Sequence, residues 1–467
     1  MIVEQIYTGC LSEAAYYIES NGIAAIVDPL RETTPYLDKL SSQKAKLKYI
    51  FITHFHADFV SGHVDLANKT GAKIIFGPNA EAEFSFHSGR DQEIFNVGNL
   101  KIKLLHTPGH TLESSCYLLS NENEEDYCIF TGDTLFIGDV GRPDLAVKSH
   151  LNENDLAKLL FKSLRTKIFP LSDDVIIYPA HGAGSACGKN MSKETFDTLG
   201  HQKKVNYALN PEMTEAEFIK EATCGLSSPP RYFPENVKMN KSINTTFEQI
   251  ISNGFTALDP KSFKNISEKE NTLIIDCRKP QEYATSHIPN SIFIGIDGGF
   301  APWAGTVISN LNQKILLVGD ENRIQEAITR LSRVGIDNTI GYLDGGMLAW
   351  EKENYITSSV RSIDAISFEN ENLENANIID VRNNNEYNDG HLKESSFLPL
   401  DKISSNISNY SKDSSYYIHC QGGYRSMIAC SILKSKGIHN LTDIKGGFMA
   451  IKTTTNFTIE KEQTIAS

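Results

Sequence analysis

Four short clusters of metal-binding residue types follow apolar runs in the first half of the chain. They are 53–59 (THFHADF), 106–111 (HTPGHT), 131–134 (TGDT) and 178–182 (YPAHG). A lone histidine is usually a packed or surface residue, whereas two at i and i+2 with aspartate at i+4 favour a metal site. Apolar runs that end on such residues indicate strands whose loops carry the ligands. We therefore expect a metal site assembled at strand ends.

A cysteine near the other end of the chain has a different chemical setting. Cys420 begins the segment CQGGYRS, which follows an apolar run and precedes a helical pattern. A glycine-containing loop that opens a helix places a thiol over free backbone N–H groups and the positive end of the helix dipole. This setting stabilises a thiolate or a persulfide anion, and Arg425 adds positive charge suited to sulfite or thiosulfate oxygens. We therefore predict that Cys420 is a reactive nucleophile.

The elements that position these residues fall into three segments. The first ~240 residues alternate β-rich apolar runs with polar, turn-rich stretches, which predicts a layered α/β fold. Residues 225–246 then hold three prolines and little periodicity, so we expect a linker or a surface crossing there.

An internal repeat follows. The stretch at 273–291 reappears at 377–395 with a constant shift of 104 positions (276 to 380). Five matched pairs carry it: Asp276 and Asp380, Arg278 and Arg382, Glu282 and Glu386, Tyr283 and Tyr387, His287 and His391. Each copy reads as strand, polar loop and helix, which predicts a small parallel sheet covered by helices. The expected domains are 1–240, a middle module at 241–357 and a last module at 358–467.

The middle module differs from the last module in the loop that carries the cysteine. Where the last module has Cys420, the segment 314–323 (KILLVGDENR) contains no cysteine. Cys277 lies on the predicted strand beside Asp276 and not in the loop. The middle module is therefore expected to have a structural or packing role.

Composition narrows the classes of function. The formal net charge of the 467 residues is -13, which disfavours nucleic acid and anionic membranes as partners. The first residues lack a signal-peptide pattern and no apolar run approaches 18 residues, so we expect a cytoplasmic protein. The eight cysteines form no CxxC pair, and most are expected to be small buried hydrophobes. Cys187 is an exception, since a Gly/Ser/Ala loop joins it to His181. A thiol relay and a structural role are equally open for it, and Cys224 is a weaker rival.

Residues 1–240 resemble the metallo-β-lactamase superfamily, which implies an αββα sandwich. Its pattern HxHxDH carries a final histidine for a second metal, and here that position is Phe59. A hydrocarbon ring donates no lone pair, so we expect a mononuclear site. Glyoxalase II is the relative of similar size that uses zinc for hydrolysis.

The segment 131–144 (TGDTLFIGDVGRPD) resembles the signature of one subgroup, the persulfide dioxygenases. The resemblance implies one Fe(II) per chain, held by His54, His110 and Asp133. Two histidines and one carboxylate leave positions open for O2 and for a sulfur substrate, and Zn²⁺ has no redox change with which to activate O2. His56, Asp58 and His181 would then orient the ligands or bound water.

The last module resembles the rhodanese family over ~360–460, through IIDVR, EY..GH, CQGGYRS and KGGFMA. The loop alone would also suit a small phosphatase, but its surroundings favour rhodanese. One departure is MAI where a tryptophan is common. The implied architecture is a metallo-β-lactamase sandwich followed by two α/β rhodanese domains, of which only the last has its cysteine.

The whole chain is similar to multidomain persulfide dioxygenase–sulfurtransferases of bacterial sulfide detoxification. That resemblance implies oxidation of a low-molecular-weight persulfide by O2 to sulfite, then thiosulfate formation at Cys420. A homo-oligomer is expected, while the thiol carrier stays open. Two alternatives remain: a zinc thioester hydrolase of the glyoxalase II type, and a sulfur carrier whose metal domain only senses persulfide.

Overall fold

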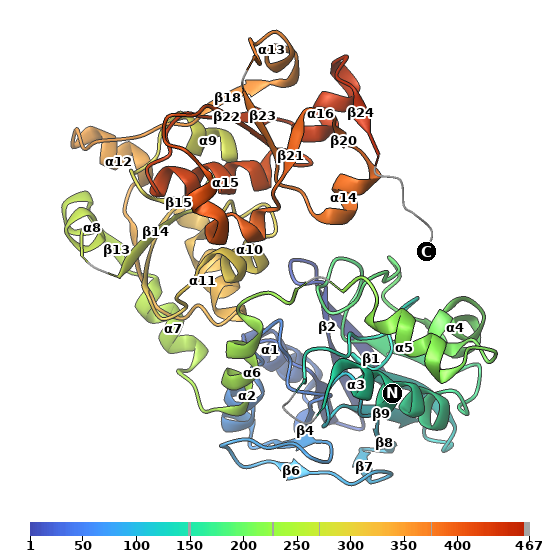
Figure 1. Ribbon diagram of the computed structural model, residues 1–467. Helices are drawn as coiled ribbons and strands as arrows, with labels where there is room; N and C mark the ends of the chain where they lie inside the picture. The colour runs from blue at the N-terminus through green and yellow to red at the C-terminus, as the bar shows by residue number, and fades with distance from the viewer. Residues whose placement is uncertain (148–150, 227, 270, 375, 462–467) are drawn as a thin grey trace. The chain divides into compact units, whose positions relative to one another are not determined.

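The structure is a computed structural model that describes residues 1–147, 151–226, 228–269, 271–374 and 376–461 (Figure 1). The chain divides into two compact units. The first comprises Met1–Gln249 together with Ser332–Gly335, and the second holds the remainder. Residues 462–467, at the end of the expected last domain, lie outside the described residues. In the part that the structure describes, no helix has both the length and the apolar character to cross a bilayer.

Two six-stranded sheets form the first unit, in the orders β1-β2-β3-β4-β5-β6 and β12-β11-β10-β9-β8-β7. The strands of the first sheet are β1 (Ile2–Thr8), β2 (Glu13–Ser20), β3 (Ile23–Val27), β4 (Lys46–Phe51), β5 (Lys73–Phe76) and β6 (His87–Ser88). Those of the second are β7 (Ile94–Val97), β8 (Leu100–His106), β9 (Ser115–Ser120), β10 (Asp126–Gly132), β11 (Ile176–Pro179) and β12 (Asp197–Thr198).

The two sheets pack face to face around an aromatic core. Phe51 of β4 contacts Tyr117 of β9 with ring centroids 4.7 Å apart, and Tyr16 of β2 contacts Phe130 of β10 at 4.9 Å. Strands such as β9 are buried along their whole length because both faces of the sheet are covered, which explains their continuous apolar sequence.

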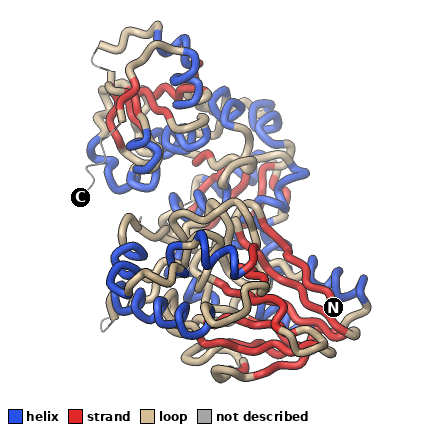
Figure 2. The backbone as a smooth tube through the Cα atoms, turned by 90° about the vertical axis from the view of Figure 1, so that its right-hand side faces the viewer, coloured by secondary structure: helices blue, strands red, loops and turns tan. Residues whose placement is uncertain are grey.

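Helices cover the outer faces and complete the αββα sandwich that the sequence predicts (Figure 2). Their bounds are α1 (Thr34–Gln43), α2 (His63–Thr70), α3 (Glu153–Ser163), α4 (Leu199–Val205), α5 (Glu215–Thr223) and α6 (Phe233–Lys241). The next helix, α7 (Phe247–Gly254), begins in the first unit and ends in the second. Leu40 and Leu66 pack α1 and α2 on the first sheet, and Leu160 and Phe218 pack α3 and α5 on the second. Capping boxes at Asn152 and Thr214 begin α3 and α5 by satisfying free N–H groups.

Of the two alternatives expected at 225–246, a linker or a surface crossing, the linker is wrong. Residues Phe233–Lys241 form α6, and Phe233, Asn236 and Asn240 are buried in the first unit. The prolines are compatible with this helix because one of them, Pro234, lies in its first turn, where a missing N–H costs no hydrogen bond.

The second unit contains two five-stranded parallel sheets in the same order, β13-β17-β16-β14-β15 and β18-β23-β22-β19-β21. The middle module has β13 (Ala257–Leu258), β14 (Thr272–Asp276), β15 (Ile292–Phe293), β16 (Lys314–Val318), β17 (Thr339–Leu343), α8 (Pro260–Ser267), α9 (Pro280–Thr285), α10 (Phe300–Val307), α11 (Glu321–Arg333) and α12 (Gly346–Lys352). The last has β18 (Arg361–Asp364), β19 (Asn377–Asp380), β20 (His391–Leu392), β21 (Ser395–Phe397), β22 (Tyr416–His419), β23 (Leu441–Lys445), β24 (Ile459–Glu460), α13 (Ala365–Glu369), α14 (Asn384–Asp389), α15 (Tyr424–Ser435) and α16 (Gly447–Thr454). The identical order confirms the repeat.

Candidate metal centre and sulfur-transfer loop

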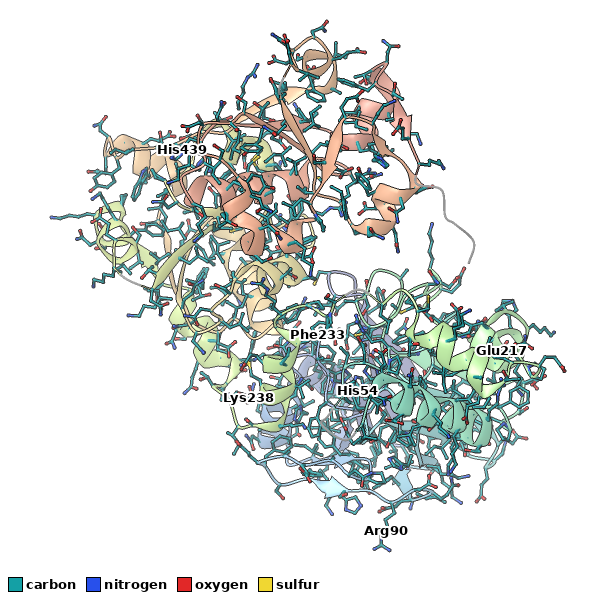
Figure 3. All side chains as sticks on the ribbon, viewed as in Figure 1. His54, Arg90, Glu217, Phe233, Lys238 and His439 are labelled. Atoms are coloured by element: carbon teal, nitrogen blue, oxygen red, sulfur yellow. The ribbon has the colours of Figure 1, made fainter. Side chains whose placement is uncertain are left out.

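The four metal-type clusters meet at one edge of the sandwich in the first unit. They follow β4, β8, β10 and β11, and the last three of these strands point the same way. Their carboxyl ends therefore share an edge. His54 lies in the interior of this unit (Figure 3), and its exposed fraction is 1%.

His54, His110 and Asp133 bring their ligand atoms within 4.8 Å of one another. The Nε2 atoms of His54 and His110 lie 3.7 and 3.4 Å from Asp133 Oδ2. Two ligands that each lie about 2.1 Å from one ion stand at nearly this separation. The three residues that the resemblance names as ligands thus form one candidate binding site.

Hydrogen bonds at the far side of each ring fix which nitrogen faces the site. His110 Nδ1–H donates to the carbonyl oxygen of Arg142 at 2.8 Å. Thr53 donates its hydroxyl proton to Asp28 Oδ2 at 2.7 Å, so its oxygen accepts from His54 Nδ1–H at 3.0 Å. Both Nε2 lone pairs are left free, which is the tautomer that a metal ligand needs.

The charge state of the site also suits a cation. Burial, followed by the neighbouring His56, His110 and His181, lowers the pKa of His54 well below its ordinary value, which favours the neutral ring that binds metal. Neither carboxylate oxygen of Asp133 has a hydrogen-bond partner within the described ranges, although the side chain is buried. A buried carboxylate without a donor is costly unless a cation neutralises it. The first unit therefore contains a metal-binding site.

His56, Asp58 and His181 form a second trio with ligand atoms within 4.8 Å. His181 Nε2 lies 3.3 Å from Asp58 Oδ2 and 3.5 Å from Asp133 Oδ1, so the two oxygens of Asp133 face different trios. These three residues, expected from the sequence to orient the ligands or bound water, lie next to the first trio.

Cys187 joins Asp133 and His181 in a third overlapping group. Its side chain is buried, and burial together with the carboxylates of Asp58 and Asp133 raises the pKa of the thiol well above its ordinary value. A bound dication would lower the pKa of this thiol. The rival, Cys224, is exposed at the end of α5.

Two supporting residues were missed by the sequence argument. Asp28 follows β3 and accepts the backbone N–H of Thr53 at 2.8 Å, and its Oδ1 lies 3.1 Å from His56 Nε2. Asn240 of α6 donates to the carbonyl oxygens of His56 and Phe59, each at 2.8 Å, and accepts from the N–H of Ser61 at 2.8 Å. Three hydrogen bonds from one buried amide hold the loop that carries the first cluster.

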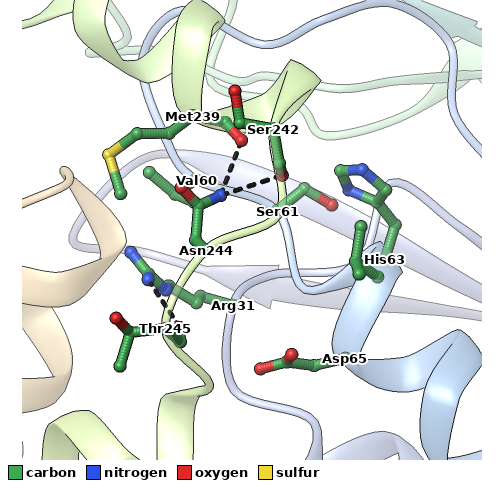
Figure 4. A pocket seen from close by; sticks show the side chains of 10 residues that line it. Arg31, Val60, Ser61, His63, Asp65, Met239, Ser242, Asn244 and Thr245 are labelled. Carbon is green, nitrogen blue, oxygen red and sulfur yellow. Dashed lines mark hydrogen bonds between the residues drawn. The ribbon is translucent and has the colours of Figure 1, made fainter. Parts of the chain in front are cut away.

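Two cavities of very different size lie near this loop. One of about 180 Å³ reaches His110 and is lined largely by apolar side chains, with Glu113 and Lys241 as its charged members. The other, of about 20 Å³, lies between Ser61, Arg31 and the segment after α6, where Arg31 donates to the carbonyl oxygen of Thr245 (Figure 4). The second has the volume of one water molecule, so the first is the candidate substrate pocket.

In the last module, Cys420 follows β22 and precedes the first turn of α15. The N–H of Gly423 donates to Cys420 Sγ at 3.1 Å, and Ser426 Oγ lies 3.6 Å from the same sulfur. Ser426 in turn donates to the buried carboxylate of Asp443 at 2.7 Å. The predicted geometry of a thiol over a helix start is present, and the link to Asp443 was not foreseen.

Arg425 does not project freely from this loop. Both of its terminal nitrogens donate to Glu386, each at 2.6 Å, so the guanidinium is engaged by a carboxylate of the repeated motif. The expected contact of Arg425 with a sulfur oxyanion stays a prediction. For that contact, the guanidinium must either bind Glu386 and the oxyanion together or release Glu386. Arg382, packed flat on Phe448, donates to the side chain of Gln421 at 3.3 Å.

The middle module has glycine where the last has its nucleophile. Asp276 pairs with Val318 as Asp380 pairs with His419, so Gly319 corresponds to Cys420. A Cβ on Gly319 would stand 2.6 Å from the sulfur of Cys277, which fills the vacant volume. Burial raises the pKa of Cys277 to about 12, and its S–H donates to the carbonyl oxygen of Val318. This thiol is a packing group.

Comparisons with known proteins agree with this architecture. Residues 8–181 match the metallo-beta-lactamase superfamily, and residues 259–353 and 368–454 match the rhodanese-like domain. A probable hydroxyacylglutathione hydrolase, glo2, of Schizosaccharomyces pombe is 32% identical over 46% of this chain and 80% of its own length. A crystal structure of a metallo-beta-lactamase from Staphylococcus aureus is 32% identical, covers 73% of this chain and 98% of that one, and has a TM-score of 0.65.

A structure of ETHE1 from Myxococcus xanthus is 26% identical over 52% of this chain and 98% of that one, with a TM-score of 0.44. The chain belongs to the metallo-β-lactamase superfamily, and it carries two rhodanese-like domains after its metal-binding unit.

Proposed function

We propose that the first unit oxidises the terminal sulfur of a low-molecular-weight thiol persulfide with O2, and that the last module converts the product into thiosulfate. The observation that carries the proposal is Phe59. It is fully buried, and its ring lies against His56 at the position where the superfamily pattern has a second-metal histidine. The trio of His54, His110 and Asp133 supplies two imidazoles and one carboxylate, the set that suits non-haem Fe(II).

Bound at His54, His110 and Asp133, Fe(II) would supply open coordination positions for O2 and for a sulfur anion, together with the redox change that zinc lacks. The protein's part is to fix the ligands through Thr53 and the Arg142 carbonyl, as the hydrogen bonds above describe. The apolar walls of the cavity beside His110 limit the access of water.

The overall reactions balance without a further reductant. In the first, RSSH, O2 and H2O give RSH, sulfite and two protons: the S–S bond breaks and the terminal sulfur gains three oxygens. In the second, the Cys420 thiolate takes a sulfane sulfur from another RSSH. Sulfite then attacks the outer sulfur of the Cys420 persulfide, thiosulfate leaves, and the thiolate is restored. One chain carrying both activities raises the effective concentration of sulfite for its acceptor.

A zinc thioester hydrolase is the second candidate. Its support is the name of the hydroxyacylglutathione hydrolase relative and the trio of His56, Asp58 and His181, which retains potential ligands for a second metal. Hydrolysis by a two-metal site uses a metal-bound hydroxide and consumes no O2.

Metal analysis combined with an oxygen electrode separates the two candidates. We expect about one iron per chain, O2 consumption on a persulfide of a small thiol, and sulfite among the products. Two zinc ions per chain with thioester hydrolysis and no O2 uptake would overturn the proposal in favour of the hydrolase.

A further inference from the structure

We propose that the cysteine-free middle module positions the sulfur-transfer loop of the last module by holding the side chain of Tyr424. Both modules belong to the second compact unit, and α15 packs against β15 of the middle module. Tyr424 is the first residue of α15 and lies four positions after Cys420. In this role it is a positioning residue, because it acts on the sulfur through the backbone.

The Tyr424 socket consists of Phe293, Gly295 and Gly298 of the middle module. The phenol O–H donates to the carbonyl oxygen of Gly295 at 2.6 Å, and the ring meets that of Phe293 edge to face with centroids 5.8 Å apart. Burial raises the pKa of Tyr424 well above its ordinary value, so the phenol stays a hydrogen-bond donor throughout the neutral range.

Two glycines give the ring its space. A Cβ on Gly298 would stand 2.4 Å from the Tyr424 ring, and one on Gly295 would stand 3.2 Å from it. The repeat shows that these glycines are particular to the middle module. Phe293 corresponds to Phe397 through the matching strand registers, so the equivalent positions of the last module are Pro399 and Lys402. The module without a cysteine in its loop is therefore the one that has room for the Tyr424 ring.

One residue, Gly423, connects Tyr424 to the hydrogen bond at the sulfur. Gly423, whose N–H donates to Cys420 Sγ, directly precedes Tyr424 and has a φ of 95°, in the left-handed region. Arg425, held by Glu386, directly follows it. Anchoring Tyr424 therefore fixes the start of α15 and keeps the Gly423 N–H aimed at the sulfur, where it stabilises negative charge.

Two substitutions test this role with little change of volume in the last module. Tyr424→Phe removes only the phenol oxygen, whereas Gly298→Ala places a methyl group against the ring from the other module. Tyr410→Phe is the matched control, because this buried phenol in the last module has no hydrogen-bond partner among the described residues.

The decisive measurement is the pH dependence of Cys420 alkylation by iodoacetamide in the full-length protein, followed by mass spectrometry. We expect the profile to move to higher pH in both variants, and transfer of sulfane sulfur to sulfite to slow about fivefold for Tyr424→Phe and more for Gly298→Ala. O2 consumption and the Tyr410→Phe control should match the wild type.

An alkylation profile and a transfer rate equal to the wild type in Tyr424→Phe would overturn the proposal. Because Tyr424→Phe keeps the ring, it remains informative even if Gly298→Ala fails to fold. The rate measurement rests on the proposed sulfur transfer, but alkylation does not require activity. Failure of the proposed function and failure of the socket are therefore distinguishable.

Discussion

Phe59 packs on the ring of His56 with centroids 4.3 Å apart and an interplanar angle of 30°. An aromatic hydrocarbon thus stands beside the second trio and contributes no ligand to it. If this substitution keeps the site mononuclear, Phe59→His should raise zinc content and lower persulfide oxidation, because a second metal favours hydroxide chemistry. Metal analysis measures the zinc content, and an oxygen electrode measures persulfide oxidation. Unchanged metal content would mean that the geometry around Asp28 and Asn240, and not Phe59, controls occupancy.

Removal of a proposed ligand should abolish binding and oxidation together. His54→Ala, His110→Ala or Asp133→Ala each leaves two of three ligands, so we expect iron content and O2 uptake to fall more than tenfold. The control is His87→Ala, an exposed histidine paired with Glu93 on the same unit. An iron-free variant that still consumed O2 at the normal rate would contradict the assignment.

Substitution of Cys420 should separate the two reactions. Cys420→Ser removes the sulfur acceptor but leaves the metal centre, so O2 uptake continues and the product changes from thiosulfate to free sulfite. Cys277→Ser should leave the products unaltered, since this buried thiol with a raised pKa acts in packing. Ion chromatography distinguishes the two anions. Normal thiosulfate formation by Cys420→Ser would assign the transfer to another thiol, with Cys187 the first to examine.

Loss of the Asn240 side chain should loosen the metal loop. Asn240→Ala leaves two carbonyl oxygens and the Ser61 N–H unsatisfied in a buried site, at a cost of about 2–4 kcal/mol. We expect faster loss of metal to a chelator and a lower unfolding temperature. Asn244→Ala is the matched control, because among the described residues the side chain of Asn244 bonds to carbonyl oxygens of its own segment and not to the metal loop. Equal chelation rates for the two variants would refute a role for Asn240.

Burial raises the pKa of Asp443 to about 6, against an ordinary value of 3.8. Between these two pH values the folded state binds more protons than the unfolded state, so this carboxyl group makes stability fall as pH rises through that window. A shift of about two pKa units corresponds to about 3 kcal/mol at most. Asp443→Asn should remove this decline and flatten the profile.

Fluorescence is a suitable probe for that test, because both tryptophans, Trp303 and Trp350, lie in the second unit. Denaturant unfolding at about pH 4.5 and about pH 7 gives the free energy of unfolding of the wild type and of Asp443→Asn at each pH. The same pH dependence in both would show that Asp443 does not titrate in this window.

The sequence by itself determined the parts whose signals are local. The short patterns are the strands followed by loops with His54, His110, Asp133 and His181, the 104-residue repeat and the missing cysteine of the middle module. The structure places them in the predicted architecture. Such patterns are legible because apolar periodicity and loop chemistry act over a few neighbouring residues.

Only the tertiary structure decided how distant segments meet. Asn240 lies 184 positions from His56, and Gly295 lies 129 positions from Tyr424, yet each pair shares a hydrogen bond. No local pattern encodes such a partner, so the helix within 225–246 and the pairing of Arg425 with Glu386 were not foreseen. These contacts arise from packing of whole sheets and helices, which sets what each side chain faces only after the chain has folded.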